Sequence, residues 1–516
     1  MRIKPRTGDP VTDLALDLFV KKKQGLVFVN TRRSAEACAE RIAKAVKKHL
    51  TVATRRNIAS TAKNALSSPT EQCKRLSKSL KHQSAFHHSG LHSKQRTLVE
   101  ESFKRGDIRI ICATPTLAAG LDMPAYRVVV RDLQRYSGGW GMQPIPVLEY
   151  EQMSGRAGRP SYDDIGEAIT VAKTGGEKND IIKEYIHGDP EDIQSKLASR
   201  PVLRTYVLSL VAARFVDSED ALQEFMSDTF YAHQYGDSHE LQSIISNVTQ
   251  NLREWDMLKG KTETTGFVSA SEYTTGQSLK ATRLGKRVSE LYLDPLTGKH
   301  IAERIKNYED HSTFSLLHAL VYTLEMRPYS RVKKADKNRV EAKLLRVEDE
   351  LLVEPPEPFQ EDYREFLNSV KTAMVLEEWI EETGESEIHK GFGVTPGELQ
   401  ARRSDAEWLA YSAREINKII QNKSVRKPLK KLETRIKQGV KEELLALTRF
   451  KGIGRVRARR LQNAGVKDAG DVKRIDAQKL QDILGSKTAV KLKKQVGQTI
   501  QEVQPEQHGN LLDYQS

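Results

Sequence analysis

The sequence predicts a multi-domain protein of mixed fold class, in which one α/β lobe with a parallel sheet is followed by helical domains. Its 516 residues exceed what one hydrophobic core accommodates, and domains of about 100 to 200 residues imply roughly three to five units. Short apolar runs alternate with helical stretches from residue 25 to about 175, which is typical of a parallel sheet covered by helices. Beyond about residue 190, amphipathic helical patterns replace the strand signal.

The parallel sheet is expected from four strands in this first part of the chain. They are predicted at residues 26–29, 108–112, 128–131 and 168–171, and a helix is expected to begin near Ser34. Ligands of such folds bind at the carboxyl ends of the strands. The segments Asn-Thr-Arg-Arg at 30–33 and Ala-Thr-Pro-Thr at 113–116 are expected there.

The later segments predict three kinds of helical structure. Helices are expected at 204–215, 218–230 and 241–258, and the polar stretch 260–278 after them indicates a hairpin, so that together they suggest a winged helix. Residues of about 296–430 indicate a helical bundle that a Pro-rich loop at 354–358 interrupts. After about residue 436, short basic helices are separated by Gly turns.

Composition narrows the classes of partner and compartment. Lys and Arg total 83 against 69 Asp and Glu, and this excess of +14 favours an anionic partner, nucleic acid ahead of a membrane; a solvated basic surface is the alternative. No run of about 18 apolar residues and no secretory pattern occurs, so we expect a cytoplasmic protein without membrane contact. Cys38, Cys73 and Cys112 are widely spaced and are expected to be reduced and buried.

The segment 151–160, Glu-Gln-Met-Ser-Gly-Arg-Ala-Gly-Arg-Pro, places Arg156 and Arg159 in a turn bounded by glycines. Guanidinium groups bind phosphoryl oxygens bidentately and stabilise charge that develops during phosphoryl transfer. Gly155 and Gly158 would let the backbone approach closely. The alternative is a loop with two surface arginines.

Three further segments match this turn in order and spacing: Leu-Val-Phe-Val-Asn-Thr-Arg-Arg at 26–33, Phe-His-His-Ser-Gly-Leu-His at 86–92 and Ala-Thr-Pro-Thr-Leu-Ala-Ala-Gly-Leu-Asp-Met-Pro at 113–124. Together with 152–160 they resemble motifs four to six of superfamily 2 helicases. The resemblance narrows to the archaeal HelQ-type, Ski-like, ATP-dependent DNA helicases and extends from about Asp9 to residue 500. It implies a second RecA-like lobe at 1–190, a winged helix at 191–295, a helical ratchet domain at 296–435, and a helix-hairpin-helix DNA-binding domain with a tail at 436–516.

The first RecA-like lobe of that family is not recognised in this sequence. The only GKT, at 260–262, has Trp255 where a phosphate-binding loop needs Gly, and Asp-Glu-Leu-Leu at 349–352 is no DExH box. We therefore expect the chain to be inactive in ATP hydrolysis without a first lobe, supplied as a separate polypeptide or encoded upstream. The resemblance implies a shared ATP and Mg²⁺ site, with Arg156 and Arg159 as catalytic residues and with Gly120, Asp122, Gln152 and Gly155 lining the nucleotide cleft.

The resemblance also implies contacts to the phosphate backbone of the tracking DNA strand, from Thr31, Arg32, Thr114 and Thr116. Hydroxyl groups position a backbone without reading sequence. Capping at strand ends is the alternative for the threonines. For His87 and His88 we expect a structural role, because two adjacent histidines do not make a metal site.

A hairpin is expected at 133–146, where Gly138-Gly139 would leave Tyr136, Trp140 and Met142 exposed at its tip. The family has its duplex-splitting hairpin at this position, and an aromatic wedge there replaces lost stacking worth about 1 to 3 kcal/mol per base. A loop packed on a neighbouring domain is the alternative.

A further helix opens at Thr-Pro-Gly-Glu, 395–398, which has the pattern of a capping box with Pro at the first position. Trp408 and Tyr411 lie beside its expected buried stripe, which consists of Leu409, Ala413, Ile416 and Ile420. The helix resembles the family's ratchet helix, whose Trp stacks on a base of the translocating strand; a core Trp is the alternative. Ala401 departs from the basic residue that the family has early on this helix, so Arg402 and Arg403 are both candidates for the phosphate contact.

Near the end of the chain, Gly452-Ile-Gly454 would expose backbone N–H groups where a basic helix containing Arg457 begins. It resembles a helix-hairpin-helix, and a helical turn with a solvated face is the alternative.

Together with the resemblance, these features predict the DNA-engaging and translocating portion of an ATP-dependent 3′–5′ DNA helicase that unwinds forked DNA in replication-fork repair. Expected partners are forked or single-stranded DNA, a separate first lobe, and single-strand-binding or replication proteins. The alternatives are a non-catalytic nucleic-acid-binding protein that has lost its motor, and an RNA helicase fragment.

Overall fold

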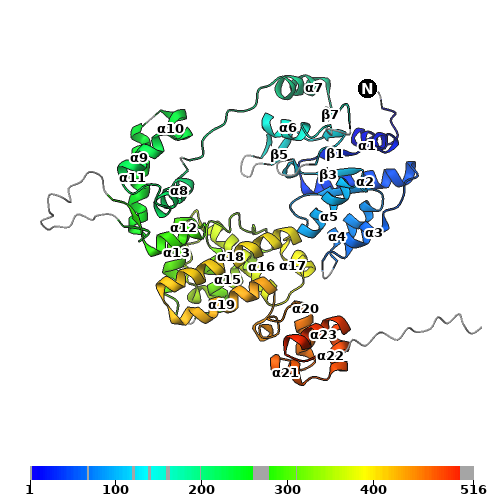
Figure 1. Cartoon of the computed structure of the whole chain (residues 1–516). Coiled ribbons are helices and arrows are strands. Elements are labelled where there is room, and N and C mark those ends of the chain that lie inside the picture. Colours follow the sequence, from blue (N-terminus) through cyan, green and yellow to red (C-terminus); the bar gives the residue numbers. More distant parts are fainter. Residues whose placement is uncertain are drawn as a thin grey trace, which may run out of the picture. The chain divides into compact units, whose positions relative to one another are not determined.

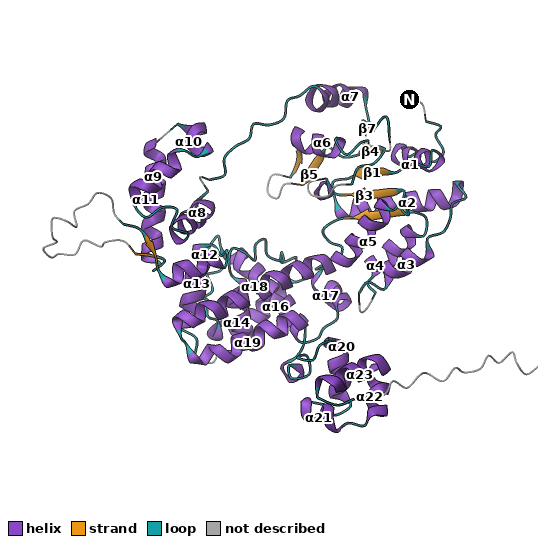
Figure 2. Ribbon diagram, viewed as in Figure 1, coloured by secondary structure: helices purple, strands orange, loops and turns teal. Residues whose placement is uncertain are grey.

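The computed structural model describes residues 3–66, 69–118, 123–136, 141–158, 163–197, 199–236, 238–259, 278–309 and 311–499 (Figures 1 and 2). The chain divides into two compact units. The first consists of Met1–Gln194 and Gly384–Ala401, and the second of Ser195–Thr383 and Arg402–Ser516.

The first unit is built on a five-stranded parallel sheet of order β2-β3-β1-β4-β7. The strands are β1 (Gly25–Phe28), β2 (Ser84–His87), β3 (Ile110–Ala113), β4 (Arg127–Val130) and β7 (Glu167–Thr170). Leu26 of β1 is in register with Ile111 of β3 on one side and Val128 of β4 on the other. The four expected strands are therefore confirmed to within two residues. Strand β2 was missed because Ser-Ala-Phe-His contains a single large apolar residue and gives no apolar run.

Helices surround this sheet and bury the strands, so that β1 to β4 are inaccessible along their whole length. The helices of residues 1–194 are α1 (Pro10–Val20), α2 (Arg32–His49), α3 (Arg56–Lys63), α4 (Glu71–Leu80), α5 (Ser93–Lys104), α6 (Val147–Ser154) and α7 (Gly175–Ile181). Helix α2 begins two residues before the expected start at Ser34, because Thr31 caps it. Cys38, Cys73 and Cys112 are buried and free, as expected.

A small antiparallel hairpin follows β4. Its strands are β5 (Gln134–Tyr136) and β6 (Met142–Pro144), and Tyr136 lies opposite Met142. The expected hairpin is thus confirmed. Its tip, with Trp140, lies outside the described residues.

The second unit begins with α8 (Arg200–Ala212), α9 (Glu219–Ser227), α10 (Phe230–Tyr235) and α11 (Ser238–Glu254). The prediction of a single helix at 218–230 is wrong, because the chain forms two helices there. Thr229 accepts a hydrogen bond from the Ala232 amide and so caps the start of a separate helix, α10. Strand β8 (Leu258–Lys259) pairs antiparallel with β9 (Lys280–Ala281), and α12 (Arg283–Glu290) follows. The polar stretch between β8 and β9 lies outside the described residues.

The rest of the second unit is helical, as expected. It contains α13 (Pro295–Lys306), α14 (Thr313–Val321), α15 (Lys337–Val347), α16 (Tyr363–Ile380) and α19 (Lys423–Gln438), together with the larger part of α18 (Pro396–Ile420). The Pro-rich loop separates α15 from α16, and α17 (Glu385–Phe392) belongs to the first unit.

The C-terminal helices are short and form their own core around residues such as Leu447, Leu461 and Leu480. They are α20 (Arg455–Asn463), α21 (Ala469–Arg474), α22 (Ala477–Leu484) and α23 (Ser486–Gln495). No helix in the described ranges is long and apolar enough to cross a membrane.

Candidate functional site

The parallel sheet brings the expected polar segments to one edge. The segments that follow β1, β2 and β3 start at Val29, His88 and Thr114, and parallel strands end on the same side of a sheet. The main-chain N–H of Asn30 donates to Asp132 Oδ2, beyond the end of β4, at 3.0 Å and so joins the ends of β1 and β4. The sequence prediction of a shared edge is therefore confirmed for these segments.

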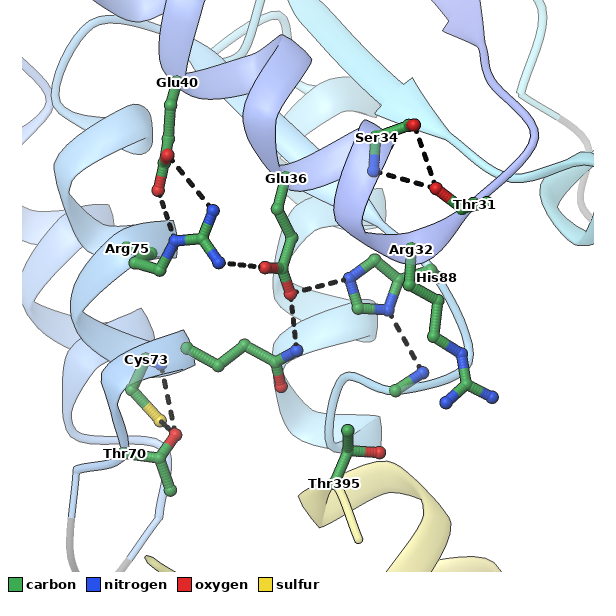
Figure 3. Close-up of polar contacts among 12 residues, drawn as sticks. Thr31, Arg32, Ser34, Glu36, Glu40, Thr70, Cys73, Arg75, His88 and Thr395 are labelled. Carbon is green, nitrogen blue, oxygen red and sulfur yellow. Dashed lines mark hydrogen bonds and ion pairs between the residues drawn. The ribbon is translucent and has the colours of Figure 1, made fainter. Parts of the chain in front are cut away.

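The threonines at this edge have local partners and remain accessible. The hydroxyl of Thr31 accepts from the Ser34 amide at 3.1 Å, so this exposed residue caps α2 (Figure 3). Thr114 and Thr116 lie 3.0 Å apart, hydroxyl to hydroxyl, and Thr116 is exposed. The Thr31 hydroxyl also donates to Ser34 Oγ at 2.9 Å, so it would have to give up this contact to donate to a phosphate oxygen.

Arg32 is engaged by a residue that is far away in sequence. Its Nη1 pairs with Oε1 of Glu398 on α18 at 2.5 Å, and both side chains remain more than a third exposed. The other oxygen of Glu398 accepts from the amide and the hydroxyl of Thr395, each at 2.8 Å. Burial acts to raise the pKa of Glu398, yet the Thr395 amide and Arg32 hold that pKa below its ordinary value.

The first turn of α18 is attached to the loop after β2 by main-chain contacts. The Gly397 amide donates to the Gly90 carbonyl at 3.1 Å, and the side chain of Gln400 exchanges two hydrogen bonds with Ser93. A Cβ on Gly397 would collide with main-chain atoms of Ser89, Gly90 and Leu91, so only glycine fits. The predicted capping box is confirmed, and its Glu398 also pairs with Arg32 at the start of α2.

A buried polar network stabilises the same loop (Figure 3). His88 is fully buried; its Nε2 lies 3.2 Å from Glu36, and its Nδ1 accepts from the Gly90 amide at 3.1 Å. Glu36 also pairs with Arg75 and accepts from Gln72. Burial raises the pKa of Glu36, but these hydrogen bonds and Arg75 lower it overall. His87 pairs with Glu100 at 2.8 Å, so both histidines have structural partners.

The arginine turn lies at the end of α6. Arg156 Nη2 donates to the Ala118 carbonyl at 2.6 Å, and Ala157 bridges to Ala125. Gly158 has a φ of +91°, which favours glycine there. Gly155 caps α6, where a Cβ would lie 2.9 Å from the Glu151 carbonyl, so its glycine has a local reason as well. Gln152 is exposed one turn earlier, whereas Gly120, Asp122 and Arg159 lie outside the described residues.

In the second unit, Trp408 is half-buried on α18 and donates from Nε1 to the Leu291 carbonyl at 3.1 Å. It is therefore neither a fully enclosed core residue nor fully exposed. Leu409, Ala413 and Ile416 form the predicted buried stripe, and Ile420 is half-buried. Tyr411 is 38% exposed.

The two candidate arginines of α18 already have intramolecular partners. Arg402 donates to the carbonyls of Met326 and Pro328, and the Arg403 guanidinium lies 3.5 Å from the centre of the Trp379 ring. Either arginine would have to give up these contacts before it could bind a phosphate. The sequence alone does not reveal these contacts.

In the C-terminal helices, Gly452 has a φ of +89° and Gly454 precedes α20 with open space around it. Arg457 is exposed and donates to the Gly452 carbonyl at 2.8 Å. The turn therefore presents backbone to solvent beside an exposed cation.

Comparison with known families first defines the class of protein. Residues 53–161 match the family described as the helicase conserved C-terminal domain, and residues 314–439 match domain 4 of archaeal helicases. The parallel sheet with its arginine turn is thus a helicase C-terminal lobe.

Curated relatives narrow the class. The chain is 36% identical over 510 residues to the ATP-dependent DNA helicase Hel308 of Methanocella arvoryzae, covering 96% of this chain and 66% of the relative. It is 37% identical over 506 residues to Hel308 of Pyrococcus horikoshii, covering 97% and 68%, and 35% identical to that of Methanococcus vannielii, covering 96% and 68%. The chain belongs to the family of archaeal Hel308 ATP-dependent DNA helicases, and it spans about two thirds of the length of these relatives.

Proposed function

We propose that this chain engages DNA and translocates along it within an ATP-dependent 3′–5′ DNA helicase that unwinds forked DNA in replication-fork repair. One observation carries the proposal: the helix that contains Trp408 starts on the lobe that contains Arg156. Arg32, Gly397 and Gln400 make that attachment. Because α18 runs from Pro396 in the first unit to Ile420 in the second, we propose that it links the nucleotide site to the DNA strand on which Trp408 would stack.

Arg156 is the group that fits a nucleotide phosphate. A guanidinium has five N–H donors, and the contact with the Ala118 carbonyl occupies one, so the others can bind phosphoryl oxygens. We propose that Arg156 and Arg159 perform this role, with Gln152, Gly155, Gly120 and Asp122 lining the cleft. Bound ATP with Mg²⁺ would supply the free energy of phosphoanhydride hydrolysis. Mg²⁺ at a nucleotide is held by one or two carboxylates together with the phosphates, and we propose that an opposing lobe shares this site.

Backbone contacts on the tracking strand are assigned to the sheet edge. Thr31, Thr114 and Thr116 present hydroxyls there, and Arg32 would bind a phosphate by exchanging its partner Glu398. Such contacts fix register without reading sequence. The β5–β6 hairpin, with Tyr136 and Trp140, is proposed to separate the duplex.

The remaining nucleic-acid contacts are assigned to the second unit. Trp408 would stack on a base, and Arg402 or Arg403 would bind a nearby phosphate after giving up a present contact. Gly452, Gly454 and Arg457 would hold a DNA backbone in a helix-hairpin-helix at 436–516. We propose that 191–295 is a winged helix and that 296–435 is the ratchet domain. A lobe that carries the phosphate-binding loop is the principal protein partner, and single-strand-binding or replication proteins are further ones.

The test combines this chain with the first lobe of a Hel308 relative as a second polypeptide. Forks with a 3′ tail or a 5′ tail are offered with ATP, and strand separation is measured. We expect unwinding of the 3′-tailed fork, dependent on both polypeptides. Tight fork binding without ATP turnover in the mixture would favour a non-catalytic binding protein, and equal unwinding of a matched RNA fork would favour an RNA helicase.

A further inference from the structure

A basic hollow lies at the corner where α18 turns into α19, wholly within the second unit. Its volume is about 530 Å³, and its cationic lining consists of Arg414, Lys418, Lys423, Arg426 and Lys430. The remaining lining residues carry amide side chains, Asn417, Gln421 and Asn422. Two of these cations pair with carboxylates outside the lining, Arg414 with Glu433 at 2.8 Å and Lys418 with Glu415 at 2.7 Å. The unneutralised charge of the hollow therefore comes from α19.

The cations of α19 fall into two groups. Three are paired: Lys431 with Glu442 at 2.5 Å, Arg435 with Glu381 at 2.5 Å, and Lys437 with Glu407 at 2.9 Å. By contrast Lys423, Arg426, Lys427 and Lys430 are exposed, and within the described part of the chain none of the four makes an ion pair. We call these four residues the open basic row.

The open basic row opposes the local preferences of a helix. Arg426 and Lys430 are four residues apart, as are Lys423 and Lys427, and like charges at this spacing repel each other and destabilise a helix. Only one acidic residue, Glu433, occurs on α19, and it pairs with Arg414 instead. A local rule broken without internal compensation points to a ligand that supplies the missing negative charge.

The geometry of the row fits a linear polyanion. At about 1.5 Å per residue, Lys423, Arg426 and Lys430 rise by about 4.5 and then 6 Å along one helix face. A row of cations at short regular steps matches the repeated charges of a phosphodiester backbone. Neutralising successive phosphates in this way requires no sequence reading.

The absence of a stacking platform favours duplex over single-stranded nucleic acid. Sites for single strands combine cations with aromatic rings on which bases stack. None of the residues lining the hollow is aromatic. Tyr411, one turn before Arg414, has the Arg414 guanidinium over its ring, 5.2 Å from the ring centre. We propose that the open basic row and its hollow bind the phosphate backbone of duplex DNA.

This site is distinct from the strand contact proposed for Trp408. At 3.6 residues per turn, Arg414 and Lys418 lie about 120° and 80° around α18 from Trp408. Binding there needs no nucleotide, so the inference rests on the proposed function only in taking DNA as the ligand.

The experiment compares two double variants with equal loss of charge from one helix. Arg426→Ala with Lys430→Ala removes half of the open row, and Lys431→Ala with Lys437→Ala removes two paired cations. Binding of the whole chain to a fluorescein-labelled blunt duplex is followed by anisotropy from 50 to 200 mM KCl without ATP. Circular dichroism and the thermal midpoint check that both variants fold.

The plot of log K against log salt has a negative slope, and each lost duplex phosphate contact makes this slope shallower by about 0.9. We expect the Arg426/Lys430 variant to lose about 1.8 from this slope and to bind up to about 60-fold more weakly at 0.1 M salt. The Lys431/Lys437 variant is expected to stay within twofold of the unmodified chain.

Equal effects of the two variants would overturn the inference, because net charge alone would then explain binding. A loss confined to a single-stranded probe, with duplex binding unchanged, would also overturn it. So would competition by polyglutamate as strong as that by duplex at equal charge, since the row would then suit an acidic protein. Failure of the proposed function is read separately, from the absence of ATP-dependent unwinding in the two-polypeptide mixture.

Discussion

Replacing Gly397 by alanine is expected to loosen the start of α18 from the first unit. A Cβ there would lie 2.5 Å from the Leu91 carbonyl oxygen and 2.8 Å from the Gly90 carbonyl carbon, and it would also collide with the Ser89 carbonyl. These are main-chain atoms, which move less readily than the end of a side chain. Overpacking costs about 1 to 3 kcal/mol, and collision with three main-chain atoms places this change in the upper half, at about 2 to 3 kcal/mol. The helix propensity of alanine returns about 1 kcal/mol. The net loss is about 1 to 2 kcal/mol.

The loss can be measured as local opening by hydrogen exchange. Because 1.4 kcal/mol is a factor of ten, amides of residues 397–401 should exchange about 5 to 30 times faster. Gly175→Ala is the matched control, since nothing lies within 4 Å of a Cβ there and its φ is not positive. If residues 397–401 exchanged at the same rate in both variants, the attachment of α18 through Gly397 would be refuted.

Two further predictions concern the second unit. Trp408→Ala should weaken binding to a 3′ single-stranded tail by about 1 to 3 kcal/mol, or about 5- to 150-fold by anisotropy, because a base stack is lost. Trp255→Ala, which removes another half-buried tryptophan, is the control and should change this binding less than twofold. Equal losses in the two variants would contradict the stacking role. His318 is fully buried beside Ser369, and burial lowers its pKa to about 3, below the ordinary 6.5. Because its folded pKa is depressed, the unfolded chain binds the extra proton, so stability falls as pH drops below about 6.5, by roughly 1 kcal/mol between pH 7 and 5.5. His318→Gln should reduce this pH dependence of the thermal midpoint, and an unchanged dependence would contradict the assignment.

Local signals in the sequence predicted much of the fold. The capping box at Thr395 and Glu398 is a contact across three residues, and the strands of the sheet are short apolar runs; both depend on nearby residues and were found. Strand β2 was missed because its neighbours in the sheet, rather than its own composition, make it a strand.

The candidate site was less predictable, because its contacts join distant segments. Arg32 meets Glu398 across 366 residues, and no periodicity or spacing encodes that pair. Arg403 lies on Trp379 and Arg402 binds the carbonyls of Met326 and Pro328, although both appear in the sequence as ordinary helix-surface cations. The residue types in the sequence indicate which chemistry each side chain can perform. The partner that each side chain contacts could be identified only from the structure.

The central claim is that the arginine turn senses a nucleotide held by an opposing lobe while α18 carries the response to DNA. The most direct measurement is the rate of fork-stimulated ATP hydrolysis by this chain mixed with a relative's first lobe, with and without Arg156→Lys and Arg159→Lys together. An arginine that stabilises phosphoryl transfer contributes about 10³ to 10⁵ in rate, so the double variant should lose at least about a thousandfold while fork binding persists. Hydrolysis and unwinding at the unmodified rate in the double variant would contradict the account.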